Sequence, residues 1–289
     1  MAGWRVGILD FCDIAAAGSR MDGTLAIAQR AEDLGYAAFW LAEHYTGNVG
    51  HANAPMAAIP VAGTTEKIRV GPAGMMMRYT QPLYAANMWA LLAELFPERI
   101  DFGLSMGAAT GPYEALMAYG LDAATLDPLK RMEATAALLA RDATTPLIPP
   151  RREDPNLWFL GSSARSAASA AAHGARYCLS LTHGPKPPPG EVAGAYLDHF
   201  APQPGCEPEL AILVGGVCLP DASRRDVAVA RALASWSGQH LLAGDVAYWK
   251  DTLAELGERY RTRNIVFRDV CGTLLDRLES LELFADAAR

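Results

Sequence analysis

Short apolar runs alternate along this chain with longer stretches in which apolar residues recur at helical spacing. The runs are rich in Val, Ile, Leu and Phe, which is typical of buried strands, and the longer stretches predict amphipathic helices. This alternation favours a parallel sheet wrapped by helices, an α/β fold. We predict strands over residues 5–11, 37–41, 68–77, 100–105, 157–160, 176–181, 210–218 and 264–267.

Eight strands with intervening helices are the pattern of a closed (β/α)8 barrel, a TIM barrel, rather than of an open sheet. Helices are predicted over 24–34, 55–64, 82–96, 164–173, 223–235, 246–260 and from 273, with one or two more before 141. No Gly-rich nucleotide fingerprint follows the first strand, which weakens the case for a Rossmann fold. We therefore expect one barrel domain over residues 1–289.

Composition indicates a globular protein and argues against nucleic acid, metal and membrane as partners. Of 289 residues, 51% are hydrophobic and 20% charged, and the formal net charge of −7 offers no basic surface for nucleic acid. Five scattered cysteines without a C-x-x-C spacing argue against a disulfide framework or a zinc site. No uncharged apolar stretch reaches the roughly 18 residues of a membrane helix, and no export signal is evident. We expect a cytoplasmic protein without a membrane partner.

Catalytic groups of such barrels come from the carboxyl ends of the strands, and the second predicted strand ends in polar residues. Glu43, His44, Tyr45 and His51 follow it closely. A histidine there could act as a general base, because its ordinary pKa of about 6.5 lies near cellular pH. Alternatively, Glu43 and His44 bond to each other or to the loop backbone and only hold the turn. Metal binding is disfavoured, since carboxylate or Cys partners at a recognised spacing are missing.

Two further strand ends carry candidate binding groups. Met75 and Met77 could line a pocket for a flat apolar ligand, or they could fill the core. After the fifth predicted strand, a helix begins in the sequence SSARS, which is residues 162–166. Its hydroxyls, exposed backbone N–H groups and guanidinium suit a phosphate, although plain capping by a serine is the simpler alternative.

Longer segments carry a family resemblance. FWLAEHYTGNVGHANAP, TTEKIRVGPAGMMM, QPLYAANMWALLAELFPERIDFGLSMG and PNLWFLGSSARSAASAAAHG are together similar to segments of the bacterial luciferase-like flavin monooxygenase family. The resemblance covers most of the chain and is strongest over 36–107 and 155–183. The family fold is a (β/α)8 barrel, in agreement with the strand count.

The resemblance implies roles for residues near a flavin ring. His44 matches the family histidine beside the reactive edge of the flavin, where it serves as a base or hydrogen-bonding group. Ala73 and Gly74 fall where relatives often have a non-prolyl cis peptide packed against the ring, and Met75 follows them as a further cofactor-binding candidate. Tyr45 stands in place of a second family histidine.

Other positions would hold the flavin phosphate. Ser162, Ser163 and Ser166 match the family's phosphate-cradling positions, with Arg165 among them. Ser105 and Met106 stand where many relatives have an arginine that pairs with this phosphate. Arg165 or Arg78 could supply the missing guanidinium. The segments 141–155 and 181–210, where relatives build substrate lids, are shortened.

The function implied by the resemblance is that of a two-component monooxygenase. Such an enzyme takes reduced FMN from a separate flavin reductase and uses O2 to oxygenate a small organic or carrier-tethered substrate. A homodimer is also expected, with the helices after the first three strands as interface elements. The alternatives are a non-catalytic flavin- or partner-binding homologue and an oxidoreductase that uses the deazaflavin F420.

Overall fold

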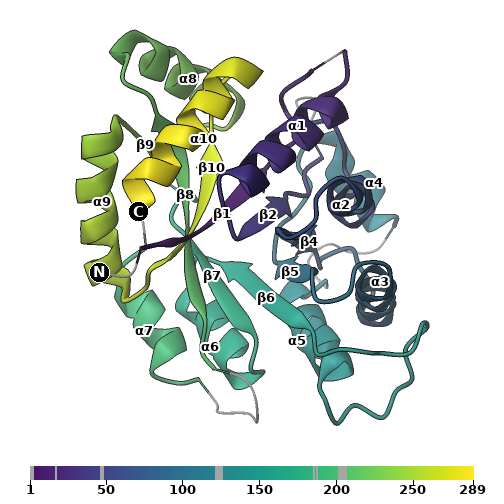
Figure 1. Ribbon diagram of the computed structural model, residues 1–289. Helices are drawn as coiled ribbons and strands as arrows, with labels where there is room; N and C mark the ends of the chain where they lie inside the picture. Colours follow the sequence, from purple (N-terminus) through teal and green to yellow (C-terminus); the bar gives the residue numbers. More distant parts are fainter. Residues whose placement is uncertain are drawn as a thin grey trace.

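The computed structural model describes residues 3–16, 18–45, 49–120, 126–184, 186, 188–200 and 207–289. In these residues, parallel strands surround a common axis and helices cover the outside (Figure 1). The strands are β1 (Arg5–Asp10), β2 (Ala38–Leu41), β3 (Arg69–Pro72), β4 (Met75–Met76), β5 (Asp101–Ser105), β6 (Asn156–Gly161), β7 (Arg176–Ser180), β8 (Leu210–Cys218), β9 (Leu241–Gly244) and β10 (Asn264–Asp269).

The strand order closes the sheet into a barrel. Hydrogen-bonded neighbours run β3-β2-β1-β10-β8-β7-β6-β5-β4, with every pair parallel. β3 and β4 are two parts of one predicted strand, separated by Ala73 and Gly74, and a bridge between Val70 and Ile100 joins β3 to the start of β5. With β3 and β4 taken together, the predicted barrel strands are all present, and the predicted TIM barrel is confirmed.

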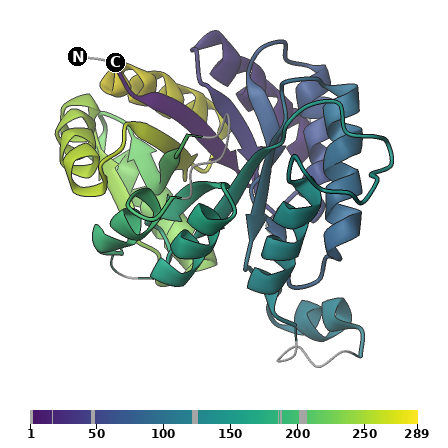
Figure 2. The same ribbon diagram turned by 90° about the horizontal axis from the view of Figure 1, so that it is seen from below.

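Helices follow the strands in the way the sequence indicates. They are α1 (Arg20–Asp33), α2 (Ala54–Gly63), α3 (Pro82–Leu95), α4 (Pro112–Ala118), α5 (Pro128–Leu139), α6 (Ala164–Ala172), α7 (Glu191–Leu197), α8 (Ala222–Ser235), α9 (Val246–Tyr260) and α10 (Leu274–Ala288). Most begin at a Ser, Asn, Asp or Thr whose side chain accepts a backbone N–H of the first turn. The short α4 projects away from the barrel (Figure 2). None of the helices in the described ranges is long and apolar enough to span a bilayer.

Two elements differ from the prediction. β9 pairs with β8 over Gly215–Cys218, beyond the part of β8 that β7 covers, and so extends the barrel wall at its carboxyl end. Its residues Leu241–Ala243 are only half-buried, so they lack the strong apolar pattern of a core strand. α7 lies between the predicted strands 176–181 and 210–218, where we predicted no helix.

The barrel interior is filled by large aromatic side chains. Trp40 of β2 and Trp158 of β6 meet edge to face with their ring centroids 5.0 Å apart. The indole nitrogen of Trp40 donates to Asp101 Oδ2 at 2.7 Å, which satisfies both groups in the dry interior. This packing closes the barrel below its carboxyl end, where the candidate chemistry lies.

Candidate active site

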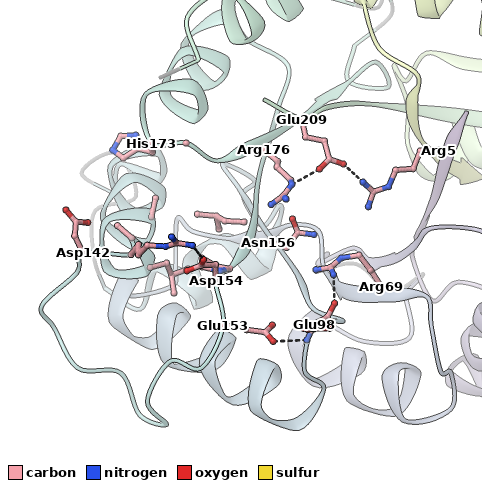
Figure 3. Close-up of a pocket in the computed structure, with 17 residues that line it drawn as sticks. Arg5, Arg69, Glu98, Asp142, Glu153, Asp154, Asn156, His173, Arg176 and Glu209 are labelled. Atoms are coloured by element: carbon pink, nitrogen blue, oxygen red, sulfur yellow. Dashed lines mark hydrogen bonds and ion pairs between the residues drawn. The ribbon is translucent and has the colours of Figure 1, made fainter. Parts of the chain in front are cut away.

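A cavity of about 880 Å³ opens at the amino-terminal ends of the strands (Figure 3). It is lined by arginines and carboxylates that pair with one another. Glu209 binds Arg5 Nη1 at 2.5 Å and Arg176 Nε at 2.6 Å, and Arg69 Nε lies 2.5 Å from Asp101 Oδ1. Paired charges at this end of a barrel serve stability, and the functional site is expected at the opposite end.

His44 lies just past β2 in an aromatic setting. Its ring stacks on Phe11, which follows β1, with the centroids 4.7 Å apart and 16° between the planes. Trp236, just past α8, approaches the same imidazole at 4.7 Å. The end of the second strand therefore carries a histidine with aromatic neighbours, and its catalytic role stays a prediction.

Burial keeps the His44 imidazole uncharged. Burial first, and then the positive charge of Arg268 and two neighbouring histidines, His183 and His51, lower the pKa of His44 to about 3. At neutral pH its ring thus has one N–H donor and one acceptor nitrogen. The uncharged ring can therefore donate one hydrogen bond and accept another, whereas so low a pKa makes it a weak base at neutral pH.

Glu43 links two strand ends. Its Oε2 accepts the backbone N–H of Met76 at 3.3 Å, and its Oε1 accepts the Tyr45 hydroxyl at 3.2 Å. Burial raises the pKa of Glu43 to about 7, although both hydrogen bonds lower it in part. The sequence alone suggested that Glu43 holds the turn, and it carried no signal for the near-neutral pKa of this carboxyl group.

The segment between β3 and β4 is held from below by β5. The peptide bond between Ala73 and Gly74 is cis, as the family resemblance implied. Ser105 Oγ donates to the carbonyl groups of Gly74 and Met75, each at 3.2 Å. A Cβ at Gly74 would lie only 3.0 Å from Ser105 Cβ, so a larger residue does not fit without a shift. Ser105 therefore positions this segment, and contact of Ala73 and Gly74 with a flavin stays a prediction.

The methionines near the ends of β4 and β5 pack in two different places. Met75 and Met77 are buried in the core between barrel and helices, and the half-buried Met106 packs against the same core. Of the two alternatives left open for Met75 and Met77, this packing favours the core over the pocket. Met76 has its side chain near Gly107, at the carboxyl end of β5. A cofactor contact of Met75 or Met106 stays a prediction.

The predicted phosphate turn is the start of α6. Ser163 caps the helix by accepting the N–H of Ser166 at 3.3 Å, and the buried Ser166 hydroxyl bonds to Tyr177 at 2.9 Å. Ser162 and Arg165 are exposed, and Arg165 Nη2 lies 3.7 Å from Asp127 Oδ2, a long ion pair. Capping thus occupies Ser163 and Ser166, whereas Ser162 and Arg165 remain accessible to an anion. The other arginine considered, Arg78, donates to the carbonyl of Leu126.

Three residues near His44 were missed by the sequence analysis. Arg268 of β10 places its guanidinium carbon 3.9 Å from the Phe11 ring centroid and 5.5 Å from that of Trp236. His183 bonds through Nδ1 to Ser180 Oγ at 2.7 Å. Arg268 and His183 could have been predicted, because each lies within a few residues of the carboxyl end of a predicted strand, where the catalytic groups of such barrels are found. Trp236 has no such signal.

Comparison with curated proteins gives named relatives. The chain is 29% identical over 223 residues to the N-acetyl-S-alkylcysteine monooxygenase of Bacillus subtilis (strain 168), covering 72% of this chain and 66% of the relative. It is 27% identical over 226 residues to a luciferase-like monooxygenase of Escherichia coli (strain K12), covering 75% and 67%. The chain thus spans about two thirds of these relatives, and half of some others.

Solved structures share the fold. Apo-MsnO8 superposes with a TM-score of 0.83 at 23% identity, covering 98% of both chains. An F420-dependent secondary alcohol dehydrogenase superposes with a TM-score of 0.76 at 15% identity over the whole of both chains. The FMN-bound oxygenating constituent of 3,6-diketocamphane monooxygenase from Pseudomonas putida reaches 0.71 at 12%, covering 99% and 98%. At these identities the likeness concerns the fold alone.

A family model described as luciferase-like monooxygenase matches residues 5–266. That match runs from β1 into β10 and includes each site residue described above except Arg268. The chain therefore belongs to the luciferase-like monooxygenase family.

Proposed function

We propose that this protein is a two-component, FMN-dependent monooxygenase. It would take reduced FMN from a separate flavin reductase and use O2 to oxygenate a small organic or carrier-tethered substrate. The observation that carries the proposal is the uncharged His44, set among aromatic rings at the carboxyl end of the barrel. Family membership supports it, as does the monooxygenase activity in the names of the relatives.

The residues at this end of the barrel fit a flavin. Both ring nitrogens of His51 are buried without a partner among the described residues, so they would be satisfied by a ligand with polar ring atoms. Ser162, Arg165 and the first N–H groups of α6 would hold the phosphate. His44 and the Ala73–Gly74 segment would face the ring. Reduced FMN, when bound, supplies the electrons that reduce O2.

The chain itself would orient groups and exclude water. Phe11 and Trp236 hold the His44 ring in place and shield it, which strengthens any hydrogen bond that it makes. The neutral His44 can donate or accept a hydrogen bond at the reacting centre. Glu43 fixes the backbone at Met76 relative to β2 and so keeps both walls of the site in register.

We also propose a homodimer through α2 and α3. These helices expose large apolar side chains, among them Met56, Tyr84, Leu91 and Leu95, which are 50–66% exposed. Such a row of apolar groups on neighbouring helices is typical of an association surface. A second copy of the chain would cover it.

Reoxidation of bound flavin tests the proposed activity. Purified protein is mixed anaerobically with reduced FMN and then rapidly with O2, while the absorbance of oxidised flavin is recorded. We expect reoxidation to be delayed relative to free reduced FMN. Reoxidation at the free-solution rate would contradict the proposal and favour F420 or a non-catalytic homologue. Parallel titration with F420 separates these two alternatives.

A further inference from the structure

A second, smaller pocket lies beside His44, at the carboxyl ends of β1 and β10. It has a volume of about 130 Å³ and is lined by the arginines Arg20, Arg231 and Arg268 together with Phe11 and Trp236. We call it the arginine pocket. Three arginines around so small a space favour the binding of an anion. Arg20 Nη1 donates to the Val49 carbonyl at 3.0 Å and Arg231 Nη1 to the Cys271 carbonyl at 3.4 Å, and neither of these acceptors is an anion.

Arg268 is the unusual member of this group. Its side chain is only 4% exposed, and its guanidinium donates to the neutral Gln239 Oε1 at 2.6 Å. Among the described residues, no carboxylate lies within the 4.0 Å of an ion pair with Arg268. Burial lowers the pKa of Arg268 to about 10, so the group is still charged at neutral pH. A buried charge without a paired anion is costly, and a ligand anion would offset that cost.

One carboxylate, Asp13, also lines the pocket, but it is already engaged. Its Oδ1 binds Arg277 Nη1 at 2.8 Å, and Arg277 in turn contacts the buried Asp10 and Asp269. Although burial raises the pKa of Asp13, the Arg277 charge and hydrogen bond lower it below its usual range. Asp13 is thus bound to Arg277, while its charge also acts at longer range on Arg268 and Arg231. The pocket therefore has three lining arginines and this single carboxylate, which is already bound to a fourth arginine.

We propose that the arginine pocket binds the carboxylate of a small-molecule substrate. Phe11 and Trp236 contact both Arg268 and His44, so an anion held here directs the rest of its molecule past these rings toward His44. A planar carboxylate suits a volume of this size and the paired N–H groups of arginine. The substrate class is thus a carboxylic acid with an apolar part to be oxygenated.

This pocket is separate from the predicted phosphate turn at α6. In the barrel, β7 and β8 lie between β6, which leads into that turn, and β10, which carries Arg268. The site would therefore hold two anions, the flavin phosphate on one side and the substrate carboxylate on the other. The role of this carboxylate rests on the proposed function, but its binding can be measured without flavin or turnover.

Binding of 3-phenylpropionate to the flavin-free protein, measured by isothermal titration calorimetry, tests the assignment. We expect the carboxylate to bind at least about tenfold more tightly than 3-phenylpropionamide. Arg231→Gln, an exposed position, should weaken carboxylate binding by about tenfold. Arg152→Gln removes the same charge from a side chain that is 74% exposed on the segment before β6, and it should leave binding unchanged. Arg268→Lys keeps the buried charge and tests the guanidinium geometry, provided that circular dichroism shows a folded protein.

Several results of this titration would contradict the carboxylate assignment. Equal binding of acid and amide, no binding of either, or equal effects of Arg231→Gln and Arg152→Gln would overturn the proposal. Inorganic phosphate that displaces 3-phenylpropionate with higher affinity would also overturn the carboxylate assignment. FMN that displaces it would assign the pocket to the flavin instead. Failure of the flavin reoxidation test alone would leave this binding result intact.

Discussion

Glu43 Oε2 lies 3.3 Å from the backbone nitrogen of Met76, so one carboxylate ties the end of β2 to β4. The residue next to it is His44, and the backbone that it holds follows the Ala73–Gly74 bond. The two walls that would face a flavin are thus joined through a group whose pKa is about 7. The protonation of Glu43 and the geometry of the site are therefore coupled.

Replacement of Glu43 should change how stability depends on pH. Because its folded-state pKa is raised from 4.5 to about 7, the stability that its neutral form contributes is complete below pH 4.5 and is lost as pH rises through 7. Relative to Glu43→Gln, the wild-type protein should lose on the order of 2–3 kcal/mol between these limits. Urea unfolding at a series of pH values measures this. The exposed Glu258→Gln serves as control, and parallel pH profiles for all three proteins would contradict the prediction.

Loss of the His44 ring should impair turnover more than cofactor binding. We expect His44→Ala to lower kcat by about 10²-fold or more, as for the loss of a preorganised hydrogen bond at the reacting centre. The affinity for FMN should change by less than about threefold, because the proposed phosphate contacts and the contact of Ala73–Gly74 with the ring remain. Stopped-flow kinetics and fluorescence titration measure the two quantities. His199→Ala, at an exposed position, is the matched control. A loss of flavin binding equal to the loss of turnover would assign His44 a structural role.

The phosphate turn can be tested by comparing FMN with riboflavin, which lacks the phosphate. Arg165→Gln and Ser162→Ala should each weaken FMN binding by roughly threefold to tenfold and leave riboflavin binding unchanged. Arg152→Gln supplies the same charge change as Arg165→Gln at a similarly exposed side chain, 74% against 72%. If FMN and riboflavin respond equally, the phosphate lies elsewhere.

The dimer surface predicts a change in association state. Leu91→Glu places a charge on α3, where the side chain is 50% exposed, and should convert a dimer into monomers. Analytical ultracentrifugation over a range of concentrations measures this. The control is Leu275→Glu on α10, which makes the same substitution at a position 76% exposed outside the proposed interface. This variant should remain a dimer. A monomeric wild type, or a dimer in both variants, would rule out this interface.

Sequence pattern predicts the barrel well because its core strands have strong apolar runs. The run at 210–218 became β8 with the same bounds, and Pro82 begins α3 as its fixed φ favours. β9 was missed because its side chains are half-buried and carry little pattern. The predicted strand 68–77 is interrupted at Ala73 and Gly74, where backbone geometry rather than side-chain polarity decides the break.

The sequence predicted only those parts of the candidate site whose residues are adjacent in sequence or directly follow a predicted strand. His44 could be found because it directly follows an apolar run, and the start of α6 because its groups are adjacent in sequence. The contact of Arg268 with Phe11 joins the two ends of the chain, and Trp236 enters from the end of α8. Contacts of this kind arise from barrel closure, which composition and spacing do not encode.

β9 has a consequence for the kinetics of ligand binding. Trp236 and Gln239 lie in a short connection fixed by α8 at one end and by β9 at the other, and His240 N donates to the carbonyl of Thr182 at 3.2 Å. This connection is therefore already ordered in the folded protein, so ligand binding does not have to pay the entropy of ordering it. A ligand entering the arginine pocket meets a preorganised surface, so substitutions there should act mainly on the dissociation rate and little on the association rate.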